Sequence, residues 1–124
     1  MALEKDDLGC WGEKQAAKFL KGLGCRILEQ NFVSPVGEID LIALDGEELV
    51  FVEVKTRTAA DFGGPLPAVN AAKRRKIAQV AKSYLARRRS TELPCRFDVV
   101  GVTQKLDGGC EIEHIRDAFT ASGR

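Results

Sequence analysis

The hydrophobic and polar positions between Gly37 and Arg57 alternate as in two β-strands joined by a tight turn. Runs rich in Val, Ile, Leu and Phe flank the turn dipeptide Asp45-Gly46, a pattern that predicts an antiparallel hairpin. Side chains alternate between the two faces of a strand. One face is expected to be apolar throughout, with Ile39, Leu41 and Ala43 against Val50, Val52 and Val54. The other face is apolar near the turn and charged at its far end, where it carries Glu38, Asp40, Glu53 and Lys55.

The register of this hairpin decides which charges meet. If residues 45–48 form a four-residue loop, Leu44 faces Leu49 and Asp40 faces Glu53 directly. A tighter two-residue loop sets Glu38 opposite Glu53 instead. Directly opposed residues have Cβ atoms roughly 4.5–5.5 Å apart.

Two carboxylates that close repel, so one must be protonated or a cation must lie between them. Mg²⁺ and Mn²⁺ prefer oxygen ligands and bind through one or two carboxylates plus water and substrate phosphate. The pattern therefore favours a divalent metal site. It is also compatible with a solvated hairpin end, or with a simple Glu38–Lys55 ion pair.

The remaining chain completes an α/β pattern in the order α-β-β-β-α-β-β. Helical periodicity predicts helices over Asp6–Leu23 and from Leu66 or Ala68 to Arg88. The other strands are expected at Cys25–Phe32, Cys95–Thr103 and Cys110–Ile115. We expect one domain spanning residues 1–124, with a mixed central sheet between two helices.

The first helix carries one carboxylate near its apolar stripe. That stripe consists of Leu8, Gly12, Ala16, Phe19, Leu20 and Leu23. Glu13 lies roughly 20° from Leu20 around the helix axis, between small alanines. It is either the rim of the stripe or a carboxylate that reaches toward the sheet.

The composition excludes several classes of protein and of catalytic site. The sequence has 44% hydrophobic and 30% charged residues, and no apolar run approaches the ~18 residues of a membrane span. The start, MALEKDDLG, lacks a secretory signal. Four scattered cysteines without a C-x-x-C pair, and one histidine, argue against a zinc site or histidine-based catalysis. Free thiols and no export signal predict a cytoplasmic protein.

The net charge of +1 hides a strong asymmetry. Residues 1–55 hold six basic and eleven acidic residues, whereas residues 56–124 hold thirteen basic and seven acidic ones. Residues 71–89 contain eight basic residues and no acid. Such a basic helix is typical of a nucleic-acid surface. A solvated helix whose last arginines complement the helix dipole is the simpler alternative, but it leaves the basic residues of the first turn unexplained.

These motifs together resemble a known family. The segments concerned are GEKQAAKFL at residues 12–20, GEIDLIA at 37–43, FVEVKTR at 51–57, FGGPLPAV at 62–69, Lys73, RFDVV at 96–100 and HIRDAF at 114–119. The chain is identified as a member of the YraN-like family. That family is similar to archaeal-type Holliday-junction resolvases and to the wider PD-(D/E)xK nuclease superfamily.

The resemblance implies a restriction-endonuclease-like α-β-β-β-α-β core and a site on the central hairpin. Asp40 matches the metal-binding aspartate, Glu53 the second acidic ligand, Lys55 the catalytic lysine, and Glu13 the first-helix glutamate beside the metal. The proline that usually precedes the aspartate is absent, since Ile39 stands there. The implied cofactor is Mg²⁺ or Mn²⁺.

The implied reaction is hydrolysis of phosphodiester bonds in branched DNA. Lys73, Arg74, Lys76 and Arg57 are expected to contact phosphates, and related resolvases work as homodimers. Two other functions remain open on the sequence. One is a non-catalytic DNA- or RNA-binding module that kept the fold. The other is a protein-interaction role in which the basic helix docks an acidic partner.

Overall fold

The computed structural model describes residues 5–61, 66, 68–88 and 93–120. Its helices are α1 (Lys5–Gly22), the short 3₁₀ segment η1 (Ala59–Asp61) and α2 (Ala71–Arg88). Its strands are β1 (Arg26–Ser34), β2 (Gly37–Asp45), β3 (Glu48–Thr58), β4 (Cys95–Gln104) and β5 (Cys110–Phe119). None of the helices in these ranges is long and apolar enough to cross a membrane.

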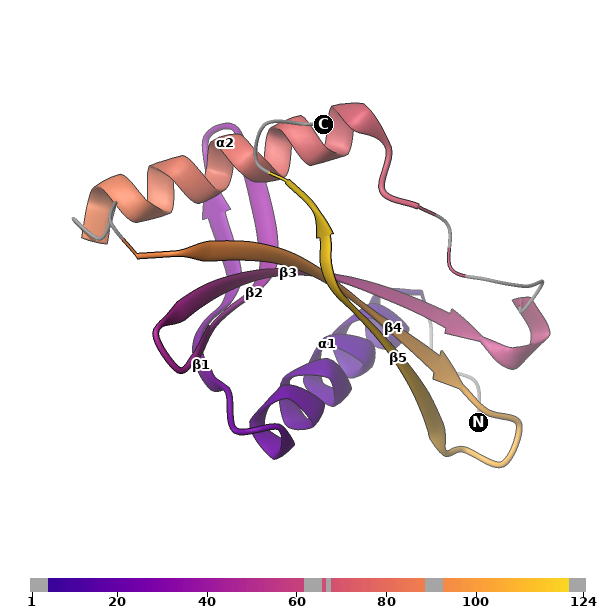
Figure 1. The fold of residues 1–124 in the computed structure, drawn as a ribbon. Helices are drawn as coiled ribbons and strands as arrows, with labels where there is room; N and C mark the ends of the chain where they lie inside the picture. The colour runs from indigo at the N-terminus through magenta and orange to yellow at the C-terminus, as the bar shows by residue number, and fades with distance from the viewer. Residues whose placement is uncertain (1–4, 62–65, 67, 89–92, 121–124) are drawn as a thin grey trace.

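The five strands form one sheet in the order β1-β2-β3-β4-β5. Neighbouring pairs are antiparallel except β3 and β4, which are parallel and are connected through α2. Figure 1 shows the sheet as a middle layer, with α1 and α2 on opposite faces. The predicted α/β class and the α-β-β-β-α-β core are therefore confirmed.

Each helix covers its own hydrophobic cluster. The α2 side contains buried residues from β2, β3, β4 and α2, namely Ile39, Ile42, Leu49, Phe51, Phe97, Val99, Ile77, Val80, Ala81 and Tyr84. The α1 side contains Ala16, Ala17, Leu20, Leu41, Ala43, Val50, Val52, Val100 and Val102. Strands β3 and β4 are buried on both faces because each face is covered by a helix, which explains their nearly continuous apolar sequences.

Helix α2 begins later than the sequence pattern predicts. The backbone N–H of Lys73 donates to Oδ1 of Asn70 at 2.9 Å, so Asn70 is the N-cap and Ala71 the first helical residue. Leu66 and Ala68 thus precede the helix. The prediction was wrong because it followed Pro65 and Pro67, which lie outside the described residues, and overlooked the capping asparagine.

Of the two registers that the sequence left open, the hairpin has the one that sets Leu44 opposite Leu49, but its loop is shorter than the four residues expected for that register. Leu44 pairs with Leu49 and Asp45 with Glu48, so only Gly46 and Glu47 connect the strands. Gly46 has a φ of 62°, which suits glycine at a tight turn. The last strand continues to Phe119, four residues beyond the prediction, and Leu23 is 57% exposed instead of lying in the helical stripe.

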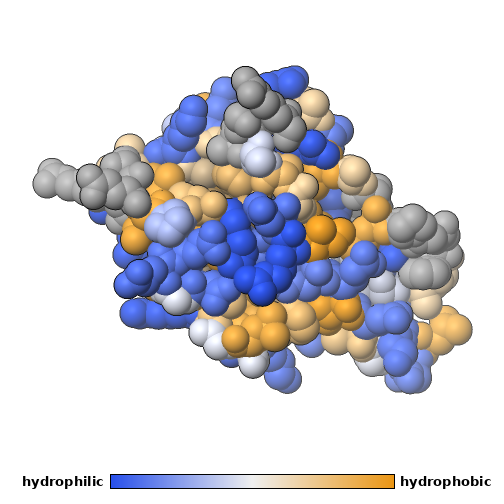
Figure 2. All heavy atoms as spheres, viewed as in Figure 1, coloured by the Kyte–Doolittle hydropathy of each residue, from blue (hydrophilic) through white to orange (hydrophobic). Residues whose placement is uncertain are grey.

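The edge strand β5 is polar on its exposed side. Figure 2, in the view of Figure 1, shows hydrophilic residues gathered across the middle of the molecule, with apolar residues above and below them. Six residues of β5 are exposed: Cys110, Glu111, Glu113, Ile115, Arg116 and Asp117. This strand is an edge of the sheet, where charged side chains oppose edge-to-edge association.

Candidate active site

Asp40 lies where the regular alternation of β2 breaks. Leu41 belongs to the α1 cluster and Ile42 to the α2 cluster, as alternation requires, but Ile39 also lies on the α2 side. The prediction that Ile39 shares a face with Leu41 was therefore wrong. The regular pairing of β2 with β3 ends at Leu41 and Val52. Asp40 is the first residue beyond this pairing.

The carboxylate of Asp40 replaces the backbone bond that the ladder lacks at this point. Its Oδ2 accepts a hydrogen bond of 2.8 Å from the backbone N–H of Val54 on β3. The side chain therefore bridges the two strands where they stop pairing, beside Glu53 in the sequence of β3. Burial raises the pKa of Asp40, while the Val54 hydrogen bond and the charge of Lys73 oppose that rise.

Glu53 faces the same point from β3. Its side chain is only 10% exposed, and its Oε1 lies 3.7 Å from Nζ of Lys73. Burial is the main cause that raises the pKa of Glu53, and the charge of Asp40 raises it further. Lys73 and Lys55 act in the opposite direction. The charge of Asp40 therefore acts on Glu53, as expected for two carboxylates that lie close together on neighbouring strands.

Glu13 reaches this region because α1 approaches β3 very closely. Gly12 lies against Thr56, and a Cβ atom at position 12 would overlap the Thr56 side chain. The next residue along the helix, Glu13, is half-buried. Burial raises its pKa, and the charge of Asp40 is the second cause. The structure therefore brings Glu13 within electrostatic reach of Asp40.

The described residues do not, however, gather three metal-ligand side chains at one point. The acidic groups are Asp40 and Glu53, with Glu13 within electrostatic reach of Asp40. Carboxylate oxygens are ligands that Mg²⁺ and Mn²⁺ prefer, and Mg²⁺ commonly binds through one or two carboxylates while it keeps several waters. The residues present fit a hard divalent ion.

The predicted basic residues divide into two groups. Lys55 is half-buried and its charge acts on both Asp40 and Glu53, as does that of Lys73. Lys76 is exposed one turn farther along α2. These three lysines face the acidic pair or the solvent near it.

The two predicted arginines have other contacts. Nε of Arg57 donates to Oγ1 of Thr103 on β4 at 3.2 Å. Nε of Arg74 donates to the carbonyl of Val69 at 2.7 Å, and its guanidinium lies 5.7 Å from the ring centre of Phe119. Arg74 therefore helps to fix the start of α2, a role that the sequence pattern did not indicate.

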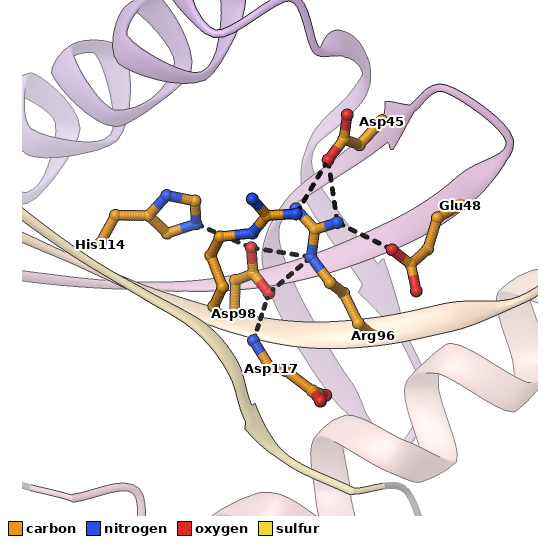
Figure 3. Close-up of polar contacts among 7 residues, drawn as sticks. Asp45, Glu48, Arg96, Asp98, His114 and Asp117 are labelled. Carbon is orange, nitrogen blue, oxygen red and sulfur yellow. Dashed lines mark hydrogen bonds and ion pairs between the residues drawn. The ribbon is translucent and has the colours of Figure 1, made fainter.

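The structure also contains a buried ionic network that sequence reasoning did not predict. Arg96 is only 7% exposed and Asp98 is fully buried. The guanidinium of Arg96 contacts Asp98 at 3.0 Å, Asp45 at 2.9 Å and Glu48 at 2.8 Å. Figure 3 shows the three carboxylates arranged around this one guanidinium.

Asp98 is the second centre of this network. Besides Arg96 it contacts Nε2 of His114 at 2.8 Å, and it accepts a hydrogen bond of 2.9 Å from the backbone N–H of Asp117. The ring of His114 also packs edge-on against Phe19 at 5.7 Å. Burial lowers the pKa of Arg96, but hydrogen bonds to Asp98, Asp45 and Glu48 outweigh it and raise that pKa above its usual range. The sequence feature that could have indicated this network is the presence of two opposite charges, Arg96 and Asp98, at alternate positions of an otherwise apolar strand.

The fold and the acidic pair define an α/β protein with a candidate site at the open end of its central hairpin. The chain belongs to the UPF0102 family, described as an uncharacterised protein family, whose model matches residues 12–102. The matched range contains Glu13, Asp40, Glu53, Lys55 and Lys73. The description names no activity.

Relatives from several bacteria match over most of their length. A UPF0102 protein of Syntrophotalea carbinolica is 45% identical over 123 residues, which cover 99% of each chain. One from Symbiobacterium thermophilum is 52% identical over 110 residues, covering 89% of this chain and 93% of the relative. One from Geobacter sulfurreducens is 44% identical over 112 residues, covering 90% and 88%.

Proposed function

We propose that this protein is a metal-dependent endonuclease that hydrolyses phosphodiester bonds in branched DNA. The observation that carries the proposal is the coupling of Asp40 and Glu53. Both are largely buried, both have raised pKa values, and each lies within the field of Lys55 and Lys73. Perturbed carboxylates of this kind are frequent at catalytic sites.

The roles of the side chains follow from their positions. Asp40 and Glu53 would hold the divalent ion, with Glu13 on α1 within electrostatic reach of Asp40. The ion, when bound, supplies an acidified water and neutralises charge on the phosphoryl group. Lys55 is placed to orient the attacking water or to stabilise the negative charge that develops on phosphate oxygens. Lys73, whose Nζ lies 3.7 Å from Oε1 of Glu53, would be available to contact a phosphate beside the site.

The substrate class follows from the charge of α2. This helix has seven basic residues and no acidic ones, and it begins beside the acidic pair. Contacts from lysines to phosphates give affinity but carry little sequence information. Recognition of DNA shape, at a branch point, is therefore favoured over recognition of a base sequence. A homodimer would present two such sites to two strands.

Cleavage assays with matched variants test the proposal. Labelled junction, flap, single-stranded and duplex DNA are incubated with Mg²⁺ or Mn²⁺. We expect the wild type to cut a branched substrate and Asp40→Asn or Glu53→Gln to lower the rate at least ~100-fold, since each loses a charge used in the transition state. Glu48→Gln, which alters a carboxylate of the buried network, should cut normally. If the wild type cuts none of these substrates with either metal, the proposal is wrong.

The ion pair between Lys73 and Glu53 favours a second function. An ammonium 3.7 Å from the carboxylate neutralises part of the charge that a metal would otherwise balance. A non-catalytic module that binds nucleic acid would need no more than this. Its binding would be steeply salt-dependent, lost in Lys73→Ala/Lys76→Ala, and indifferent to metal. DNA binding that requires both Mg²⁺ and Asp40 would exclude it.

A further inference from the structure

Asn31 has an unusual backbone conformation directly across from Asp40. Its φ is 53°, and among the described residues only Asp117 is another non-glycine residue with positive φ. On either side of it, Gln30 pairs with Leu41 and Phe32 with Ile39, which places Asn31 opposite Asp40. Asn31 is exposed, so packing in the core gives no reason for this conformation. Asparagine adopts it more readily than most residues.

The positive φ of Asn31 in β1 and the irregular alternation of β2 at Asp40 occur at the same point of the sheet. Ile39 and Ile42 both lie on the α2 side although they are three residues apart, so β2 departs from its two-residue alternation between them while its pairing with β1 stays in register. Asp40 is the residue turned toward β3. A strand can only stay paired with a distorted neighbour if it is distorted at the same place. The left-handed residue in β1 supplies that matching distortion.

The side chain of Asn31 makes a second connection to the site. Its amide lies close enough to Glu13 on α1 to lower the pKa of that carboxyl, against the burial that raises it. Asn31 therefore lies near the first-helix carboxylate through its side chain and opposite Asp40 through its backbone.

We infer that Asn31 is a positioning residue that aims Asp40 at β3 and restrains Glu13 beside it. This inference rests on the proposed function of the same site. Residues that orient metal ligands without touching the metal often change its affinity about 10-fold or more when they are replaced.

Two substitutions separate the backbone role from the amide role. Glycine adopts positive φ freely, so Asn31→Gly keeps the distortion and loses only the amide. A β-branched residue strongly disfavours it, so Asn31→Val drives β1 toward a regular strand and turns Asp40 out of its place. Asp117→Val is the matched control, because Asp117 has nearly the same φ, 52°, in a different part of the sheet.

The first measurement needs no metal. The Val54 N–H is held by the Asp40 side chain, so its hydrogen exchange, followed by NMR, reports where that side chain lies. We expect exchange in Asn31→Val to accelerate at least ~10-fold, toward the rate of Asp40→Ala, and to stay near the wild-type rate in Asn31→Gly and Asp117→Val. Wild-type exchange in Asn31→Val, or equal acceleration in Asp117→Val, would overturn the inference.

The second measurement is Mn²⁺ calorimetry on the same variants. We expect the dissociation constant to rise ~10-fold in Asn31→Val, less in Asn31→Gly, and not in Asp117→Val. Unchanged affinity in both Asn31 variants would contradict the positioning role. If the wild type binds no Mn²⁺, the proposed function fails, and the exchange of Val54 alone decides on Asn31.

Discussion

Charged side chains meet at both ends of the hairpin formed by β2 and β3, but their partners differ. At the turn end, Asp45 and Glu48 share the guanidinium of Arg96, which also contacts the fully buried Asp98. At the open end, burial raises the pKa values of Asp40 and Glu53, the charge of Asp40 raises that of Glu53 further, and the ion pair between Glu53 and Lys73 is long at 3.7 Å.

This difference distinguishes charges that stabilise the fold, at the turn end, from charges that we propose to serve binding or catalysis, at the open end. No buried side-chain polar atom among the described residues lacks a hydrogen-bond partner, so the turn end is satisfied internally. The open end keeps carboxylates whose pKa values are raised, a state that costs stability at neutral pH. Such a cost is expected where a protein retains groups for binding or catalysis.

The largest effect should come from removing the cation of the network. Arg96→Met leaves the buried Asp98 without its principal counter-charge, and we expect the free energy of unfolding to fall by about 3–5 kcal/mol. Urea denaturation measures this directly. The double variant with Asp98→Asn should recover part of the loss, because the remaining group is neutral. A loss below about 1 kcal/mol in the single variant would mean that the network is not a structural centre.

At the open end, replacing a carboxylate is expected to increase the free energy of unfolding, by less than the loss in Arg96→Met. The folded pKa of Asp40 and that of Glu53 are raised above their ordinary values of 3.8 and 4.5, so the native state binds protons more tightly than the unfolded chain. Metal-free stability should therefore fall as the pH rises from about 4 through the raised pKa values. Asp40→Asn should flatten this fall and stabilise the protein at pH 7 by about 1 kcal/mol.

Thermal unfolding between pH 4 and 8, in buffers with a chelator, checks that prediction. Asp45→Asn is the matched control, since it changes an aspartate of the same strand that contacts Arg96. It should lower stability at pH 7. If both aspartate variants shift the melting temperature in the same direction, the claim that the two ends of the hairpin use their charges differently is wrong.

The smallest effect concerns the most exposed acid of the network. The side chain of Glu48 is 37% exposed, and solvent screens much of its interaction with Arg96. Glu48→Gln should therefore cost no more than about 1 kcal/mol, whereas Glu53→Gln should be neutral or stabilising. Chemical denaturation of the two variants measures both free energies of unfolding. A larger loss in Glu53→Gln than in Glu48→Gln would contradict the assignment of a structural role to the turn end and a functional role to the open end.

The fold was predictable where the alternation of side chains is regular. The order of elements and the presence of the hairpin followed from strand patterns and the turn dipeptide, whereas the pairing of Leu44 with Leu49 was one of two registers that the sequence left open. Regular alternation also indicated that Asp40 and Glu53 would meet. It failed at Ile39, because a distorted strand no longer has a period of two and nothing in the local sequence marks the distortion except Asn31.

The buried network could not be predicted for a different reason. Arg96 and Asp45 are 51 residues apart, and their contact depends on β4 lying parallel to β3. Local patterns do not determine that strand order. The role of Arg74 was missed likewise, since its partners Val69 and Phe119 meet only when α2 lies against the sheet.

The parallel pairing of β3 and β4 has a consequence for how the chain folds. Strands β1 to β3 join neighbours through short turns, whereas β4 can only be added after the long connection through α2 has closed. Closing long loops costs more entropy and slows folding. We therefore expect β2 and β3, which carry Asp40 and Glu53, to pair first. Strands β4 and β5 are expected to join them later, and the ion pairs of Arg96 with Asp45 and Glu48 then stabilise the contact between β4 and the hairpin.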